Sequence, residues 1–415
     1  NPKESTIMHI DLNSCFASVE QQANPLLRNK PIAVAAYNSP RGCIISPSIE
    51  AKKYGIKVGM QVQQGKLLYP NLIVMEPDPE KYRKVHLQFR QLLGTYTNDV
   101  NPKSIDEFVL NIEGYPAQKI GITKTAQEIK LRIKKEIGDW LTVSIGIAPN
   151  RFLAKTASNL HKPDGLEEIN IHNFMQVYSK LELTDLTGIA NNNAVRLNNA
   201  GIHTVLDFYN QNAYTLKQAF KSIVGYHWFL RLKGWEVDDV DFGRKSFGNS
   251  FALPIHTNDY EKVTPILYRL VEKATLRMRR AGYKTQGVHV SILYTNGCHW
   301  HHAKKISVPL SFFGDIYKIA YKIFKSSPYN YPIRILAVSC FNLSKKDVIQ
   351  TLGRLPVTWA ADVANIVENS RPATWATRGY EGEHIPPPTE DLIAEEYDIE
   401  RVGADPKMTI THLNW

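Results

Sequence analysis

The chain has 415 residues, a formal net charge of +10 and hydrophobic residues at 43% of its positions. This length exceeds one ordinary domain, and the composition is that of a soluble globular protein. No apolar run reaches the roughly 18 residues of a membrane span and no signal peptide is recognisable, so we expect a cytoplasmic protein. Four scattered cysteines argue against a zinc ribbon or a disulfide framework; they are Cys15, Cys43, Cys298 and Cys340.

The charge is unevenly distributed along the chain. From Asp347 onward there are 5 Lys and Arg against 12 Asp and Glu, whereas the remainder carries 45 against 28. A basic body of this kind suits a polyanionic partner, because neutralised phosphates release their counterions. The basic balance alone is not specific, since many soluble proteins share it.

Two apolar segments of the first half each end in carboxylates. Residues 8–16 predict a strand that delivers Asp11 and is followed by a helix start at 17–22. Residues 104–110 predict a second strand that carries Asp106 and Glu107 at its head. Adjacent strand residues point to opposite faces, so these two acids converge only if the strand bends or ends there, or if a cation collects them. Three acids from two strands would make a two-cation site for phosphoryl or nucleotidyl transfer; a solvated turn and a helix cap are the simpler alternatives.

The other predicted elements follow in order. Helical spacing of apolar residues indicates helices over 82–95, 124–138 and 151–160, with a buried strand over 141–147. The segment Leu186 to Ile202 has the pattern of a helical hairpin. Beyond residue 241 we expect the order strand, helix, strand, strand, helix, strand, with bounds near 259–281, 287–294, 306–309, 312–325 and 333–343 after the first strand. That region, 244–346, carries 17 Lys and Arg against 4 Asp and Glu.

Four short motifs in order carry a family resemblance. They read Ile-Asp-Leu-Asn-Ser-Cys-Phe-Ala-Ser-Val-Glu (10–20), Ser-Ile-Asp-Glu (104–107), Gly-Ile-Ala-Pro-Asn-Arg-Phe-Leu-Ala-Lys-Thr-Ala-Ser (146–158) and His-Lys-Pro-Asp-Gly (161–165). Each is only moderately specific, but their order and spacing over roughly the first 345 residues resemble those of Y-family DNA polymerases, and most of all bacterial DNA polymerase IV.

The resemblance implies an α+β, multidomain, right-hand polymerase. Its parts would be a catalytic palm (1–17 and 76–166), small fingers (18–75), a helical thumb with a helix-hairpin-helix (167–240) and a βαββαβ little finger that binds DNA (241–346). An acidic C-terminal extension (347–415) lies outside the strong resemblance, and Val357 to Val367 could form one helix within it.

The resemblance also implies site residues. Asp11, Asp106 and Glu107 would be catalytic and would hold two Mg²⁺ ions, for which Mn²⁺ can substitute, together with the backbone carbonyl of Leu12. Nucleotide-binding positions would be Phe16, Cys15, Ser46, Lys52 and Lys162, with Phe16 as an aromatic steric gate that leaves no room for a 2′-hydroxyl and Lys162 on the β- and γ-phosphates. DNA contacts are expected at Gly188, Lys245, Ser246, Arg277, Arg279, Arg280, Lys304 and Lys305.

Three positions depart from the family pattern. Ile49 stands where Tyr is usual, Lys52 where Arg is usual, and Ala190 where Gly is usual. Lysine is a point charge rather than a bidentate fork, so the triphosphate grip would be weaker or routed through other groups. Small or neutral side chains at 13–15 suggest a roomier pocket. We expect Lys155 to be a structural or DNA-near residue.

The expected function is translesion DNA synthesis: a DNA-directed DNA polymerase of low fidelity and without proofreading, with roles in DNA repair, DNA damage tolerance and replication at the nucleoid. Primer–template DNA and deoxynucleoside triphosphates would be the partners of a monomer. A sliding clamp is a further candidate, although no clear clamp-binding peptide is seen. The rival interpretations are a catalytically silent DNA-binding scaffold and a different two-metal nucleotidyl transferase, such as a cyclase. The tract 299–302 (His-Trp-His-His) predicts an exposed hairpin rather than a metal site.

Overall fold

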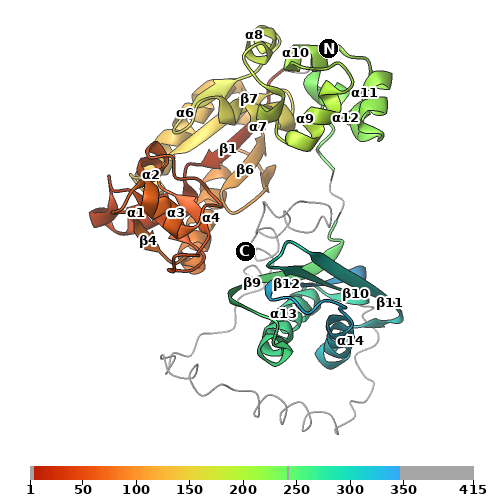
Figure 1. Cartoon of the computed structure of the whole chain (residues 1–415). Coiled ribbons are helices and arrows are strands. Elements are labelled where there is room, and N and C mark those ends of the chain that lie inside the picture. The colour runs from red at the N-terminus through yellow and green to blue at the C-terminus, as the bar shows by residue number, and fades with distance from the viewer. Residues whose placement is uncertain (1–3, 241–242, 346–415) are drawn as a thin grey trace. The chain divides into compact units, whose positions relative to one another are not determined.

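The computed structural model describes residues 4–240 and 243–345, which form two compact units on either side of residue 241 (Figure 1). We call them the first and the second unit and describe each by itself. Among these described residues, no helix combines the length and apolar character needed to cross a membrane. The predicted helix at 357–367 and the acidic extension lie outside the described residues.

A five-stranded sheet organises the first unit. Its order is β5-β6-β1-β7-β8, with β1 antiparallel to both of its neighbours. The strands are β1 (Ile7–Leu12), β5 (Val100–Pro102), β6 (Glu107–Asn111), β7 (Val143–Ala148) and β8 (Leu166–Glu168). Every residue of β1 is buried, because the central strand of a sheet covered on both faces leaves no side chain in water.

Helices cover the two faces of this sheet. Met8, Ile10 and Leu12 of β1 belong to one apolar cluster with residues from α1, α4 and α6, while Ile7 belongs to another with α7. The helices are α1 (Cys15–Ala23), α4 (Pro79–Leu93), α5 (Pro116–Ile120), α6 (Ile122–Arg132) and α7 (Arg151–Leu160). The predicted helix at 124–138 ends as an α-helix at Arg132 and continues as a π-helical turn, Ile133–Ile137.

A single glycine sets how closely α7 lies on the sheet. Gly146 of β7 faces this helix, and a Cβ built there would lie 2.0 Å from the backbone oxygen of Ala154 and 2.2 Å from the backbone nitrogen of Ser158. Only glycine permits such an approach of helix backbone to strand backbone. The close packing brings the side chains of α7 directly over β1.

Two smaller modules complete the first unit. A three-stranded sheet of order β3-β2-β4 packs with short helices around its own apolar cluster. Its elements are η1 (Pro25–Leu27), β2 (Ile32–Ala35), β3 (Ile44–Pro47), α2 (Ile49–Lys53), α3 (Val62–Leu68) and β4 (Ile73–Met75). The second module is helical and shares a core with α7 around Trp228; its elements are α8 (Phe174–Tyr178), η3 (Leu183–Asp185), α9 (Asn191–Asn198), α10 (Val205–Asn210), α11 (Ala213–Phe220) and α12 (Val224–Leu232).

The second unit has the predicted βαββαβ order. Its antiparallel sheet has the order β11-β10-β12-β9, and α13 and α14 lie on one face of it (Figure 1). The elements are β9 (Ser246–Thr257), α13 (Tyr260–Arg280), β10 (Tyr283–Tyr294), β11 (His299–Leu310), α14 (Phe313–Lys325) and β12 (Ile333–Lys345). The hairpin prediction for 299–302 is wrong, because these four residues begin β11.

Candidate active site

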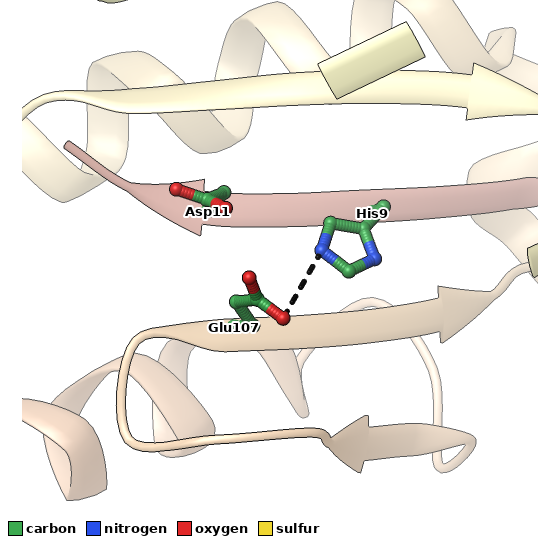
Figure 2. A group of neighbouring side chains, drawn as sticks. All are labelled: His9, Asp11 and Glu107. Atoms are coloured by element: carbon green, nitrogen blue, oxygen red, sulfur yellow. Dashed lines mark ion pairs between the residues drawn. The ribbon is translucent and has the colours of Figure 1, made fainter. Parts of the chain in front are cut away.

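Three side chains of the central sheet point toward one another at the end of β1 (Figure 2). His9 and Asp11 lie two residues apart on one strand and therefore share a face, and Asp11 is paired directly with Glu107 of β6. One ligand atom from each of the three residues lies within 4.8 Å of the other two. This is the arrangement in which a sheet can offer several donors to one cation.

Two lysines neutralise the carboxylates. The Lys155 ammonium, which comes from α7, lies 2.8 Å from Oδ2 of Asp11 and also contacts Oε1 of Glu107. Lys162 Nζ lies 2.9 Å from the same Asp11 oxygen. The sequence prediction that Lys155 is structural or DNA-near is therefore incomplete, because the structure places its charge at the centre of the acidic cluster.

Asp106 occupies the turn just before β6 begins at Glu107. Its backbone oxygen accepts a hydrogen bond from the N–H of Leu12 at 2.9 Å, which ties the ends of the two strands together. Its carboxylate accepts a hydrogen bond from the Ser104 hydroxyl. Asp106 stands outside the close trio, yet the charge of Asp11 acts on it and its own charge acts on Glu107, so the three predicted acids share one electrostatic cluster.

The surroundings lower the pKa of one of the three carboxylates and raise the pKa values of the other two. Burial would raise the pKa of Asp11, but the charges and hydrogen bonds of Lys155 and Lys162 outweigh it and hold that pKa well below its usual range. Burial is the main cause that raises the pKa of Glu107. The positive charge of Lys155 opposes this shift, and the negative charge of Asp11 adds to it. Burial and the charge of Asp11 also raise the pKa of Asp106, against its hydrogen bond from Ser104. Repulsion within such a group is relieved by a bound cation.

His9 is the member that sequence reasoning missed. It is 3% exposed and its Nε2 lies 3.7 Å from Oε2 of Glu107, with no hydrogen-bond partner. Burial, and next the charge of Lys155, lowers its pKa well below the usual value, which keeps the imidazole neutral. The signal was available, since a residue two positions before Asp11 in a strand must share its face.

Cys15, Phe16 and Ser46 are three of the residues expected around a nucleotide. The pKa of Cys15 is raised by burial and by the charges of Asp106 and Asp11. Ser46 is buried on β3 and accepts a hydrogen bond from the N–H of Ala17 at 3.4 Å. Phe16 stacks on Tyr82, with ring centroids 4.3 Å apart.

Lys52 lies on α2, the helix that begins at Ile49. Its pKa is lowered by burial and by the charge of Lys162, and is partly restored by Asp11 and Asp106. Lys52 and Lys162 therefore share one electrostatic environment beside the carboxylates. An apolar Ile49 and a lysine at 52 leave this side of the site with point charges rather than a bidentate donor.

The expected DNA contacts differ in their surroundings. Gly188 has a φ of 98° just before α9, and its carbonyl accepts a hydrogen bond from the Asn193 side chain at 3.0 Å. In the second unit Arg277 is 6% exposed and its guanidinium donates to the carbonyl of Gly248. That environment fits a structural role for Arg277 rather than a phosphate contact. Of the expected DNA contacts in the second unit, the exposed cations are Lys245, Arg279, Arg280, Lys304 and Lys305. Ser246 is half-buried.

Comparison with known proteins places this site in a family. Residues 10–159 match the impB/mucB/samB family and residues 244–352 match its C-terminal domain. DNA polymerase IV 1 of Bacillus subtilis is 32% identical over 350 residues, which cover 83% of this chain and 84% of that protein. DNA polymerase IV of Bacillus velezensis is 33% identical over 83% of each chain. DNA polymerase IV of Staphylococcus aureus is 30% identical over 82% of this chain and 96% of its own length.

The solved structures agree on the fold. A Y-family DNA polymerase chimera of Dbh and Dpo4 superposes with a TM-score of 0.72 at 24% identity, over 82% of this chain and 99% of that one. An insertion ternary complex of Dbh DNA polymerase gives a TM-score of 0.57 at 21% identity, over 82% and 99%. The chain belongs to the Y-family DNA polymerases. It is a DNA-directed DNA polymerase similar to bacterial DNA polymerases IV.

Proposed function

We propose that this chain adds deoxynucleotides to a primer 3′-hydroxyl on a DNA template, with low fidelity and tolerance of damaged templates, and that the cluster around Asp11 is where it does so. The observation that supports this most directly is the register of Asp11 with Glu107 across β1 and β6, beside Lys155 and Lys162. Negative and positive groups meet there at a strand end, as nucleotidyl transfer requires.

The parts of the chain take polymerase roles in this proposal. The five-stranded sheet would be the palm, the β3-β2-β4 module the fingers, the helical module the thumb, and the second unit the little finger. The supporting observations are the distinct apolar clusters of the five-stranded sheet, the β3-β2-β4 module and the second unit, the packing of the helical module on α7, and the division of the chain near residue 241.

The donor set fits divalent cations. Carboxylate oxygens are the ligands that Mg²⁺ prefers. Asp11 and Glu107 supply such oxygens within one cluster, where the pKa of Asp11 is lowered and that of Glu107 is raised. We propose that Asp11, Asp106, Glu107 and the carbonyl of Leu12 would hold two Mg²⁺ ions, with Mn²⁺ able to replace them. Bound Mg²⁺ supplies Lewis acidity and charge neutralisation for phosphoryl transfer.

The chain's own cations act on the incoming triphosphate. Lys162 and Lys52 carry positive charge beside the carboxylates, where they would hold the phosphates and stabilise the negative charge of the pyrophosphate leaving group. Lys155 would keep Asp11 and Glu107 ionised and in place. The ring of Phe16 would lie under the deoxyribose and exclude a 2′-hydroxyl.

DNA would be held by backbone and phosphate contacts. The turn at Gly188, before α9, would offer backbone N–H groups to a phosphate. The second unit would add the exposed cations defined above, which position the duplex without reading its sequence. We also propose a sliding clamp as a partner. The chain would act as a monomer at the nucleoid.

Primer extension with Mg²⁺ tests the function against a catalytically silent scaffold. The Asp106→Ala, Glu107→Ala double variant should lose extension while it still binds primer–template. The matched control is Glu167→Ala with Glu168→Ala, an adjacent acidic pair on edge strand β8 of the same sheet, which should extend normally. If the wild-type chain binds DNA but extends no primer, the scaffold interpretation holds; extension without any template would favour an untemplated transferase.

A further inference from the structure

Phe16 is backed by a second aromatic ring. The rings of Phe16 on α1 and Tyr82 on α4 lie parallel, with an interplanar angle of 13° and centroids 4.3 Å apart. Tyr82 is 2% exposed, whereas Phe16 is only partly buried. Any retreat of the Phe16 ring in this direction would therefore have to displace Tyr82.

The far end of Tyr82 is fixed to the same helix as Phe16. The Tyr82 hydroxyl donates a hydrogen bond of 2.9 Å to Oε1 of Glu20. Glu20 follows Phe16 by four residues on α1, so the two side chains lie on one face of that helix. Tyr82 thus contacts α1 twice, through its ring at Phe16 and through its hydroxyl at Glu20.

Glu20 is a buried carboxylate with its own counter-charge. It is 3% exposed, and Lys81 Nζ lies 2.6 Å from its other oxygen and 3.5 Å from Oδ2 of Asp78. A buried carboxylate persists as an ion only when it is paired and hydrogen-bonded. Burial raises the pKa of Tyr82, so its hydroxyl keeps the proton that it donates. In this hydrogen bond the Tyr82 hydroxyl is therefore the donor and the Glu20 carboxylate is the acceptor.

We propose that Glu20 is a positioning residue for sugar selectivity: through the Tyr82 hydroxyl it fixes the ring that supports Phe16, and so keeps the gate closed to ribonucleotides. This inference rests on the proposed role of Phe16 as the gate. A gate excludes a 2′-hydroxyl only if the ring cannot move aside, and a ring held by stacking alone can tilt. The charge-assisted hydrogen bond to Glu20 opposes that tilt, since such bonds are stronger than neutral ones.

Single-nucleotide insertion by the full chain tests this proposal. The measured quantity is the ratio of kcat/KM for a deoxynucleotide to kcat/KM for the matching ribonucleotide. Tyr82→Phe removes only the hydroxyl and should lower this ratio about tenfold, mainly through a lower KM for the ribonucleotide. Glu20→Ala should lower it to a similar extent, and Glu20→Gln, which retains an acceptor oxygen, should restore most of it.

The chain offers a matched control in Tyr96. Its hydroxyl also donates to a glutamate, Glu128, at 2.8 Å, but it takes no part in the Phe16 contact. Tyr96→Phe should leave the ratio unchanged, which separates the Glu20 contact from a general loss of one tyrosine–glutamate bond.

Phe16→Ala separates the gate role of Phe16 from the positioning role of Glu20. It should admit ribonucleotides whatever the role of Glu20. If Phe16→Ala collapses the ratio while Tyr82→Phe and Glu20→Ala both keep the wild-type value, the gate stands and the role of Glu20 is overturned. If Phe16→Ala itself leaves the ratio unchanged, the gate assignment falls and the proposal with it. Should Glu20→Ala fail to fold, Tyr82→Phe decides, because it removes a single atom.

Discussion

The ammonium of Lys155 lies 2.8 Å from Oδ2 of Asp11 and also contacts Glu107. A helix thus places a fixed positive charge between two carboxylates that neighbouring strands bring together. Any cation that binds these oxygens must share them with Lys155 or displace it. We therefore expect the lysine to stabilise the protein without metal and to compete with any metal that binds the same atoms.

Lys155→Met should make the chain more dependent on divalent cations. Without Mg²⁺ the variant leaves Glu107 without its ammonium partner and Asp11 with Lys162 alone, and leaving a buried charge unpaired is destabilising, so Tm should fall by about 2 °C or more. Added Mg²⁺ should raise Tm further in the variant than in the wild type, because a ligand that binds only the folded state stabilises it in proportion to its affinity. Thermal unfolding at increasing Mg²⁺ measures both effects.

Lys134→Met is the control for this experiment. Lys134 forms a more exposed ion pair with Asp164 at 3.0 Å and has no contact with the acidic cluster. It should show the Mg²⁺ response of the wild type. Equal Mg²⁺ responses in Lys155→Met and wild type would contradict competition between lysine and cation.

Asp106→Asn should stabilise the protein while abolishing extension. The folded-state pKa of Asp106 is raised by burial and by Asp11, so its ionised form costs stability at every pH above that raised value. At neutral pH the Asn variant should unfold at a Tm higher by about 2 °C or more. The difference should shrink as pH falls through the raised pKa toward the ordinary value, where wild-type Asp106 takes up its proton. Tm measured between pH 7 and pH 4 tests this sign; a gap that widens toward acid pH would contradict it.

Much of this architecture could be read from sequence because it depends on local pattern. Apolar periodicity located α4 and α7 within a few residues and predicted the βαββαβ order of the second unit, although β11 begins at His299 and not near residue 306. The family motifs pointed to Asp11, Asp106 and Glu107; strand register pairs Asp11 with Glu107, and a backbone hydrogen bond from Leu12 holds Asp106 beside them. The helices and strands are encoded by residues close in sequence, whereas the acids could be predicted because each lies in a short motif that can be recognised by itself.

The remainder depends on contacts between distant segments. Lys155 reaches the carboxylates only because Gly146 lets α7 approach β7, and no pattern within α7 reveals this. Arg277 reads as one of a cluster of cations at the end of α13, yet it is buried against Gly248. Composition around position 277 cannot show which helix face the sheet covers. The contact between Glu20 and Tyr82 likewise joins residues that lie 62 positions apart in the sequence.

Gly146→Ala should therefore disturb the active site indirectly, because it displaces the helix that carries Lys155. A methyl group at this position would meet the backbone of α7 at 2.0 Å, and the helix backbone cannot yield without lifting Lys155 from Asp11. We expect a loss of about 3 kcal/mol or more in the free energy of unfolding, together with reduced extension. Urea unfolding followed by circular dichroism gives the first quantity, and primer extension the second.

Gly114→Asn serves as the control for that substitution. Gly114 has a φ of 79°, and a Cβ built there would have no heavy atom of another residue within 4 Å apart from its chain neighbours. Asn tolerates this conformation better than most residues. It should cost far less stability than Gly146→Ala. Similar losses at both positions would mean that backbone freedom, rather than the contact between α7 and β7, determines the effect.

Deletion of residues 347–415 should leave primer extension intact and strengthen DNA binding at moderate salt. This segment carries the excess of acidic residues, whereas the rest of the chain is basic, so its removal takes away a charge that competes with phosphate. We expect Kd for primer–template to fall about threefold near 0.1 M salt, and the difference to vanish as salt screens the interaction. Fluorescence anisotropy over a salt series measures this. Because competition between the acidic segment and DNA phosphates is electrostatic, an affinity gain that persists at high salt would contradict it. Loss of extension would show that the segment belongs to the folded enzyme.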